Sequence, residues 1–367
     1  MNFELSGFTS SNDLLRVKNL DDNIVQELSE SKSLLDKHVK DWEIVKKIIH
    51  DYEYVYTSPS INRNIGKIVP ISRSYFKMKE ILQEFKLISD NQLKLFCMAE
   101  APGGFIQCFL EHTENINSIG AMTLLSDDKS IPYWNKNIKK SGLITFYEGI
   151  NKNGDLCDFK NIISVIKCIG RNSIDILTGD GGFDYSKNYN KQEYNSLPLI
   201  YSEIFMALNL QKAGGSFVCK VFDIFLKETI QLVYILYLSY DEIYIYKPCL
   251  SRLSNSEKYL VCKGFKGYNQ ELINKLCRSF HNKDLDLLVD TEFNDKIKQF
   301  NLSYTTKQIK QIQKGMNMIY RNIVYKYPNE KQISTAINWC KKYNIPINNY
   351  CFYLKRTISP KRLQWGR

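Results

Sequence analysis

Several hallmarks of common protein classes are missing from this chain of 367 residues. None of its ten cysteines lies at a CxxC spacing and no histidine cluster accompanies them, which argues against a structural zinc site and a disulfide framework. Cys97, Cys219 and Cys262 lie inside apolar runs, where a free thiol behaves as a small hydrophobic side chain. We therefore expect a protein of a reducing intracellular compartment, cytoplasm or nucleus, without a bound metal.

Signals for export and for membrane insertion are missing as well. The first residues, MNFELSGFTSSND, contain no basic region followed by an apolar stretch, so we expect no secretory signal. The most apolar segment, Ile230 to Tyr240, is too short to span a bilayer. No internal repeat stands out, and a chain that is 44% hydrophobic and 24% charged has the composition of an ordinary globular protein.

The charge that is present is mostly positive, with a formal net charge of +11 and a pI near 9.0. Such a balance favours a polyanionic partner, because lysines and arginines that neutralise phosphates release condensed counterions. A solvated, lysine-rich surface without any partner explains the charge equally well. The bias toward Lys, Asn, Ile and Tyr is also typical of an AT-rich coding genome, so charge alone does not decide the matter.

From residue 93 onward, short apolar runs alternate with helical spacing. We expect strands at residues 93–99, 116–125, 143–149, 174–182, 215–223, 242–248 and 258–265, with helices such as 158–169 and 199–210 between them. This alternation predicts a parallel α/β sheet with crossover helices. The last two strands are separated only by a loop, which indicates an antiparallel hairpin at one edge.

The flanks of this core have a different character. Residues 1–70 are polar and lysine-rich, with helical spacing from Leu28 to Ile49, and residues 266–367 are basic and mostly helical, most clearly over 307–326. A helix over 71–85, with Ser72 or Ser74 as its N-cap, opens the core. The sequence thus predicts an N-terminal extension (1–70), a core (71–265) and a C-terminal extension (266–367).

The segment EAPGGF, residues 100–105, follows the first strand of the core and opens a helix. Ligands of open α/β sheets bind at such strand ends, but the GxGxxG pattern of a dinucleotide site is missing. A carboxylate beside a turn of small residues suits the zwitterionic methionine moiety of S-adenosylmethionine better than a phosphate. A turn that needs glycine only for its dihedral angles stays open as an alternative.

Carboxylates also follow the next strands, at Asp127, Asp128 and Asp155. Such groups can bind ribose hydroxyls or an adenine amino group, although aspartate in a loop is usually a solvated turn residue.

Four charged residues lie in segments that the predicted strands and helices would bring together at one end of the sheet: Lys77, Asp180, Lys220 and Glu257. Methylation of a ribose 2′-hydroxyl requires removal of a proton whose pKa is far above neutrality. A lysine can remove it only if its own pKa is depressed, which desolvation and a second lysine nearby would achieve. Two carboxylates would then hold both ammonium groups in register.

Five segments occur in a fixed order along the core: SRSYFK, AEAPGGF, GDGGF, CKVFD and SNSEKYLVCKG. Together they resemble the FtsJ/RrmJ-type 2′-O-ribose methyltransferases, which carry a K-D-K-E tetrad. The similarity is closest to the cap-specific branch of eukaryotes and large DNA viruses, with its pattern AEGPGGF…ADGGF…CKTFD…SRPANSERYVVCKG. It covers residues 71–265, about half of the chain. Ala101 in place of glycine and Leu253 in place of proline are the visible departures.

The resemblance implies a Rossmann-like methyltransferase core, a mostly parallel seven-stranded sheet with an antiparallel edge hairpin, between helical extensions. It implies Lys220 as the general base, Lys77 and Asp180 as orienting and pKa-tuning partners, and Glu257 as the residue that holds the lysines and the substrate ribose. Asn190 resembles a substrate-contacting asparagine. The implied cofactor-binding residues are Ala99, Glu100, Ala101, Pro102, Gly103, Gly104, Phe105, Asp155 and Asp180.

The function implied is methyl transfer from S-adenosylmethionine to the first transcribed nucleotide of capped mRNA. Methylation of the second nucleotide, or of ribosomal or transfer RNA, remains an alternative, and so does a non-catalytic RNA-binding subunit with a decayed methyltransferase fold. The basic flanks are candidate docking surfaces for a capping enzyme or an RNA polymerase, and a large DNA virus is a plausible source. Tyr54, Tyr56 or Trp134 are candidates to stack on the cap guanine, but packing explains such aromatics more simply.

Overall fold

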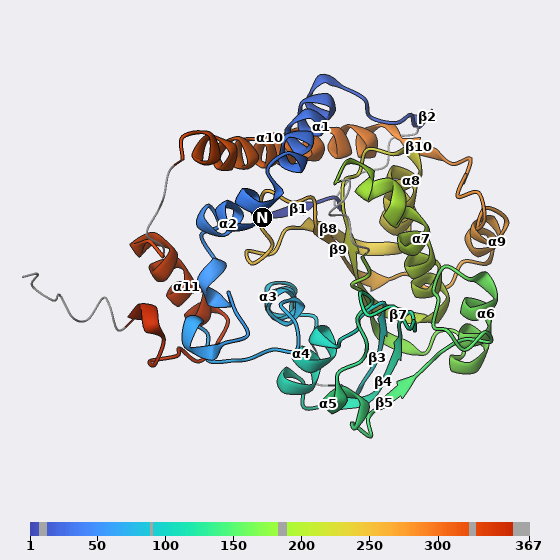
Figure 1. The fold of residues 1–367 in the computed structure, drawn as a ribbon. Coiled ribbons are helices and arrows are strands. Elements are labelled where there is room, and N and C mark those ends of the chain that lie inside the picture. Colours follow the sequence, from blue (N-terminus) through green and yellow to red (C-terminus); the bar gives the residue numbers. More distant parts are fainter. Residues whose placement is uncertain (7–12, 89–90, 183–188, 323–327, 355–367) are drawn as a thin grey trace, which may run out of the picture.

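The computed structural model describes residues 1–6, 13–88, 91–182, 189–322 and 328–354. Its centre is an eight-stranded sheet in the order β1-β8-β9-β7-β6-β3-β4-β5 (Figure 1). The strands are β1 (Asn2–Glu4), β3 (Leu93–Met98), β4 (Ile116–Met122), β5 (Ile144–Phe146), β6 (Ile174–Gly179), β7 (Gln211–Val221), β8 (Tyr240–Tyr246) and β9 (Lys258–Phe265). The predicted α/β class is confirmed.

Five strands of the sheet, β3 to β7, run parallel, and β9 is inserted antiparallel between β7 and β8. The chain leaves β3 for β4 and β5 on one side and returns for β6 and β7 on the other. The strand order therefore reverses between β3 and β6, and the carboxyl ends of these two strands form the crevice in which such sheets bind ligands.

Two details of the predicted sheet are wrong. It has eight strands rather than seven, and the hairpin of β8 and β9 is not at the edge, because β1 pairs antiparallel with β8. Asn2 lies opposite Tyr246 across this pair. A strand of three residues carries no readable alternation, and its partner lies more than 240 residues away in the sequence.

Helices cover both faces of the sheet. Phe96 and Met98 of β3 face the cluster formed with α6 (Phe159–Ile169), α7 (Gln192–Leu210) and α8 (Lys227–Ser239). Leu95 and Cys97 face the opposite cluster, formed with α3 (Ser74–Phe85) and α4 (Gly104–His112). Burial on both faces explains why the strand is a continuous apolar run rather than an alternating one. The short helix α5 (Lys136–Lys139) precedes β5.

The first helix of the core differs from its prediction at one point. Helix α3 begins at Ser74 with Arg73 at the N-cap, and no side chain caps it. Ser72 and Ser74 do not cap it because their hydroxyls hydrogen-bond to each other.

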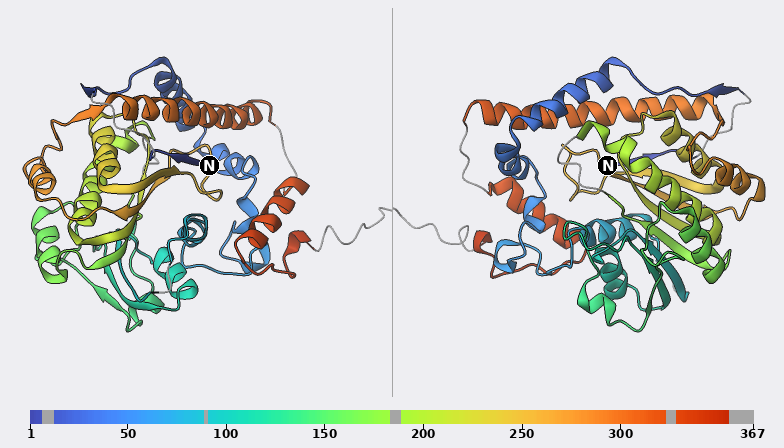
Figure 2. Two further views of the ribbon diagram at one scale, coloured as in Figure 1. Left: turned by 180° about the vertical axis from the view of Figure 1, so that it is seen from behind. Right: turned by 45° about the vertical axis from the view of Figure 1, so that its right-hand side comes forward.

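The two extensions pack against each other as well as against the core (Figure 2). The predicted helical stretch 28–49 is split into two helices, and an additional strand pairs with one from the far end of the chain. The elements are β2 (Leu14–Arg16), α1 (Asn23–Asp36), α2 (Val39–Ile48), η1 (Glu53–Val55) and η2 (Ile61–Arg63), then α9 (Gln270–Arg278), β10 (Leu288–Asp290), α10 (Thr291–Tyr320) and α11 (Glu330–Lys342). Helix α1 lies along α10, and α11 packs against η1 (Figures 1 and 2).

All ten cysteines are free thiols in this arrangement. No helix within the described ranges is long and apolar enough to cross a membrane.

Candidate active site

A pocket of about 620 Å³ opens at the carboxyl ends of β3, β4 and β6, a size typical of small-molecule sites. The ends of these strands are tied together there, since the backbone N–H of Ala99 donates to Met122 and that of Asp180 to Met98. Five of the predicted cofactor-binding residues line the pocket: Ala99, Ala101, Pro102, Asp155 and Asp180.

The other four predicted residues, Glu100, Gly103, Gly104 and Phe105, are not among the lining residues and instead build the turn behind the pocket. Gly103 has a φ of 114°, a conformation that side chains disfavour. A Cβ on Gly104 would lie 2.1 Å from Ser72 Oγ, so the turn packs directly against the start of α3. Glu100 Oε1 accepts a hydrogen bond from Phe105 N at 2.6 Å. Gly103 and Gly104 are therefore needed for the backbone conformation and close packing of the turn, which is the alternative that the motif left open.

The remaining wall of the pocket comes from residues that the motifs did not single out as ligands. Except for Leu199, which lies inside α7, they are found at a strand end, in the loop that follows it or at the start of a packed helix. They are Ser72, Ser74, Thr123, Leu124, Asp128, Ser130, Ile131, Pro132, Leu156, Cys157, Gly182 and Leu199. Asp128 had a visible signal, as a carboxylate after a strand. Ile131 and Pro132 lie in an irregular loop without a pattern.

The four predicted catalytic residues form two lysine–carboxylate pairs, one of them on the wall of this pocket, and Glu257 of the other pair lies close enough to act on the charge of Lys220. Lys77 Nζ lies 2.7 Å from Glu257 Oε1, and Lys220 Nζ lies 3.2 Å from Asp180 Oδ1. All four side chains are between 12% and 15% exposed. Lys220 also donates to the backbone carbonyl of Asp180 at 2.7 Å, and both of these residues line the pocket. The tetrad and the pocket are therefore one site.

Further hydrogen bonds hold the carboxylates in place. The hydroxyl of Tyr259 donates to Asp180 Oδ1 at 2.9 Å, and that of Ser251 donates to Glu257 Oε1 at 2.7 Å. Lys247 donates to the backbone carbonyl of Glu257 at 2.6 Å. These contacts orient the tetrad before any substrate arrives.

A model of the FtsJ-like methyltransferase family matches residues 70–265, more than half of the chain. The chain belongs to this family. FtsJ-like methyltransferases take their methyl group from S-adenosylmethionine, so the predicted family and cofactor are both confirmed.

The chain is similar to larger proteins as well. Cap-specific mRNA (nucleoside-2'-O-)-methyltransferase 1 of Homo sapiens is 30% identical over 252 residues, which cover 62% of this chain and 30% of that protein. The inactive cap-specific mRNA (nucleoside-2'-O-)-methyltransferase 1B of Caenorhabditis briggsae is 26% identical over 296 residues, which cover 74% of this chain and 35% of that protein. The chain thus spans about a third of the length of these relatives.

The structure is also similar to that of a ribosomal RNA methyltransferase of Plasmodium falciparum. The TM-score is 0.40 at 22% identity, and the match covers 54% of this chain and 99% of that one.

The residues of the pocket fit the cofactor of an FtsJ-like methyltransferase. Leu124, Ile131 and Leu156 provide apolar walls suited to an adenine ring. Asp128, Asp155 and Asp180 place three carboxylates in the same pocket, which favours a cationic sulfonium compound and disfavours a polyphosphate.

The electrostatics of the tetrad differ from the prediction at one point. Burial alone would lower the pKa of Lys220, but the carboxylates of Asp180 and Glu257 outweigh it and hold this pKa above its ordinary value. The expectation of a depressed pKa is therefore wrong for Lys220, because it faces carboxylates. For Glu257, burial opposes ionisation, but the ammonium groups of Lys77 and Lys220 hold its pKa well below the usual range.

Two buried carboxyl groups lie beneath the site. Oε2 of Glu100 and Oε1 of Glu203 have no hydrogen-bond partner among the described residues. Burial raises the pKa of Glu203 to about 8 and raises that of Glu100 well above its ordinary value. Glu203 is thus stable in the protonated form near neutral pH.

The raised pKa of Glu203 predicts a pH-dependent stability. The folded protein binds one proton more than the unfolded chain between about pH 4.5 and pH 8, so this contribution to stability is complete below that window and is lost as the pH rises through it. Glu203→Gln stays neutral at every pH and should gain at least about 3 °C in unfolding temperature relative to the unmodified protein between pH 5.5 and pH 8.5.

Thermal unfolding of both proteins across this range measures the difference. Glu271→Gln, at an exposed position of α9, is the matched control and should give a curve parallel to that of the unmodified protein. Parallel curves for Glu203→Gln as well would contradict the prediction.

Asn190, the predicted substrate-contacting residue, does not line the cofactor pocket. Its side-chain amide donates to Ser29 O at 3.3 Å and to Ser33 Oγ at 3.1 Å, so it contacts helix α1. Of the candidate stacking residues, Tyr54 and Trp134 are only 2% and 6% exposed, and Tyr56 lies beside the ring of Phe76. Packing accounts for all three.

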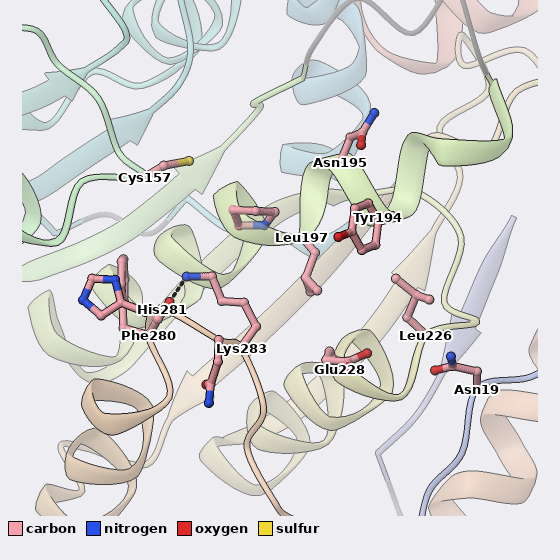
Figure 3. A pocket seen from close by; sticks show the side chains of 12 residues that line it. Asn19, Cys157, Tyr194, Asn195, Leu197, Leu226, Glu228, Phe280, His281 and Lys283 are labelled. Atoms are coloured by element: carbon pink, nitrogen blue, oxygen red, sulfur yellow. Dashed lines mark hydrogen bonds between the residues drawn. The ribbon is translucent and has the colours of Figure 1, made fainter.

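A larger hollow, of about 970 Å³, lies beside α7 and contains only one residue of the cofactor pocket, Cys157 (Figure 3). Its walls come from α7, from the start of α8 and from residues 280–283, where Lys283 donates to the carbonyl of Phe280. It contains no member of the tetrad, so the smaller pocket is the candidate active site.

Proposed function

We propose that the chain transfers the methyl group of S-adenosylmethionine to the ribose 2′-hydroxyl of the first transcribed nucleotide of capped mRNA. The observation that carries this proposal is the pairing of Lys220 with Asp180 on the wall of the cofactor pocket, with Lys77 and Glu257 completing the tetrad beside it. The resemblance to the cap-specific branch supports the substrate.

Each residue then has one role. Lys220 would accept the proton of the 2′-hydroxyl, and the cofactor would supply the methyl group that replaces this proton on the ribose oxygen. Lys77 and Asp180 orient Lys220 and tune its pKa, while Glu257 holds the lysines and the substrate ribose. The turn Ala99–Phe105 positions the methionine end of the cofactor, and Asp155 its adenosine.

Lys220 must lose its proton before it can act, although the carboxylates around it raise its pKa. The bound cofactor supplies the methyl group and a sulfonium charge, which in the pocket that Lys220 lines would lower this pKa. Exclusion of water by the RNA acts in the same direction.

A third hollow, of about 370 Å³, supports the capped end as the substrate. It adjoins the loop that carries Glu257 and combines cations suited to a triphosphate with aromatic, amide and carboxylate groups suited to a guanine. The residues concerned are Glu43, Lys46, Tyr189, Arg252 and Asn255. Asn190 supports this wall from behind through its bonds to α1.

The finer parts of the proposal concern partner proteins and the compartment. The basic extensions are where we expect a capping enzyme or an RNA polymerase to dock, in the compartment where mRNA is capped. Origin from a large DNA virus would put that compartment in the cytoplasm.

The second candidate function is a non-catalytic RNA-binding subunit, since one relative is named inactive. The complete tetrad with its two ion pairs favours the enzyme. If ribosomal or transfer RNA were the substrate, the hollow of about 370 Å³ would have no function.

The test is transfer of labelled methyl groups to three short RNAs that are capped, uncapped, or capped and already 2′-O-methylated at the first nucleotide. We expect label only on the first of them. Equal labelling of the uncapped RNA would favour a structured RNA substrate, and labelling of the pre-methylated RNA would move the target to the second nucleotide. No labelling of any of them would favour the non-catalytic subunit.

A further inference from the structure

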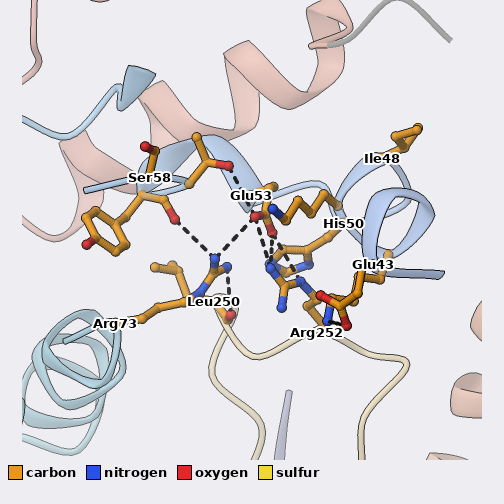
Figure 4. Close-up of polar contacts among 12 residues, drawn as sticks. Glu43, Ile48, His50, Glu53, Ser58, Arg73, Leu250 and Arg252 are labelled. Carbon is orange, nitrogen blue, oxygen red and sulfur yellow. Dashed lines mark hydrogen bonds and ion pairs between the residues drawn. The ribbon is translucent and has the colours of Figure 1, made fainter. Parts of the chain in front are cut away.

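A buried carboxylate outside the family-matched region lies directly behind the tetrad. Glu53, in η1, is 1% exposed and binds two arginines at once (Figure 4). Arg252 Nη2 donates to both of its oxygens, at 2.8 and 3.0 Å, and Arg252 Nε donates at 3.2 Å. Arg73 Nη1 donates to Oε1 at 3.4 Å.

The two arginines belong to the two segments that form one half of the tetrad. Arg73 is the N-cap of α3, one turn before Lys77, and Arg252 precedes Glu257 by five residues in the loop after β8. Arg73 also reaches this loop directly, because its Nη2 donates to Leu250 O at 3.2 Å. The contact between Lys77 and Glu257 therefore depends on how α3 and this loop are held together.

The charges on these segments would otherwise repel each other. Arg73 and Lys77 lie on α3, and Arg252 lies within the loop, so positive charge faces positive charge. His50 does not add to it, since burial and the neighbouring charges of Arg73 and Arg252 keep its pKa well below the usual range. Glu257 neutralises part of this positive charge inside the site through Lys77. Glu53 neutralises another part behind the site through Arg73 and Arg252.

We propose that Glu53 is a positioning residue of the active site: by binding Arg73 and Arg252 together, it keeps α3 and the Glu257 loop in the register that pairs Lys77 with Glu257. The proposal rests on the proposed function for its kinetic consequences only. Glu53 belongs to the N-terminal extension, so this extension would contribute to an active site that we expected the family-matched region to form without it.

The kinetic test compares Glu53→Gln with the unmodified protein. Loss of register should lower kcat at neutral pH by at least about tenfold. It should also move the ascending limb of the kcat–pH profile to higher pH, by about half a pH unit or more. The reason is that Glu257 raises the pKa of Lys220, and this effect is stronger when Lys77 no longer neutralises Glu257. A change that only reduces the folded fraction would leave this limb in place.

Two further variants keep the test decisive. Asp51→Asn removes an exposed carboxylate two residues away, which pairs with Lys331 at 2.8 Å, and should leave both kcat and the profile unchanged. Glu53→Asp keeps the buried charge with a shorter reach and is used if Glu53→Gln does not fold. An unshifted limb with kcat within about twofold of normal, in whichever of these Glu53 variants is folded, would overturn the proposal.

A second measurement does not depend on methyl transfer. Unfolding temperatures of the Glu53 variant, of Lys77→Met and of the double variant form a cycle. If Glu53 holds Lys77 on Glu257, the two losses overlap and the double variant loses less than their sum. Additive losses within about 1 °C would overturn the proposal. An unmodified protein that methylates no RNA would count against the proposed function alone, and the cycle would still decide on Glu53.

Discussion

Lys220→Met should lower kcat for methyl transfer by about 10²–10⁴-fold, the range that a positioned general base contributes. Methionine keeps the apolar stem of the side chain and removes only the ammonium group. The affinity for S-adenosylmethionine should not fall, because the change removes a positive charge from the wall of a pocket that binds a cation. Single-turnover kinetics and calorimetric titration of the cofactor measure the two effects separately.

Two further substitutions separate the base from the ion pair. Lys220→Arg keeps a cation beside Asp180, but a guanidinium does not release its proton in proteins, so kcat should be as low as in Lys220→Met. Lys212→Met lies on the same strand and removes a half-exposed lysine that pairs with Asp175, and it should change kcat less than about twofold. Substantial activity in Lys220→Arg would mean that Lys220 acts through its charge and not as a base.

The parts of this site that the sequence predicted are those with short-range signals. Asp180 and Ala99 directly follow apolar strands, and the carboxyl ends of parallel strands meet at one edge of a sheet, so local patterns were enough to bring them together. Lys77 and Glu257 were placed through the resemblance, since nothing in their spacing shows that a helix and a loop 180 residues apart meet. The structure joins them in one ion pair.

The parts that were missed depend on contacts between distant segments. Glu53 has no motif around it, and its partners lie 20 and 199 positions further along the chain. Strand β1 is defined only by its pairing with β8. The pKa of Lys220 was predicted in the wrong direction because it depends on how close each carboxylate lies, and distances of 3 Å are a property of the folded chain.

A buried ion cluster that joins the N-terminal extension to the core shows the same dependence on distant contacts. Asp223, just after β7, accepts from Lys32 of α1 at 2.7 Å and from Ser256 Oγ at 2.9 Å, and Lys258 Nζ lies 3.6 Å away. The side chains of Lys32, Asp223 and Lys258 are 7% exposed or less. Burial opposes ionisation of Asp223, but the two ammonium groups lower its pKa to about 2.

Asp223→Asn should therefore destabilise the fold by about 3–5 kcal/mol at pH 7, because it leaves two buried ammonium groups without their counter-charge. This corresponds to a fall of about 4–6 °C in unfolding temperature. Lys32→Met in the same chain removes one of the stranded charges and should recover a large part of the loss. Asp286→Asn is the control, since its partner Arg16 is 75% exposed and exposed pairs contribute little.

The pH dependence of the stability provides a second, independent test of this prediction. The folded pKa of Asp223 lies below the unfolded one, so its contribution is complete above about pH 4 and is lost as the pH falls toward 2, where the two proteins should converge. They should also converge on the alkaline side. Burial lowers the pKa of Lys258 to about 8 even with Asp223 present, and without that charge the lysines lose their protons still more easily. A stability difference that stays constant from pH 3 to pH 9 would mean that Asp223 acts through hydrogen bonds and packing, which its asparagine replacement largely keeps, and not through its charge.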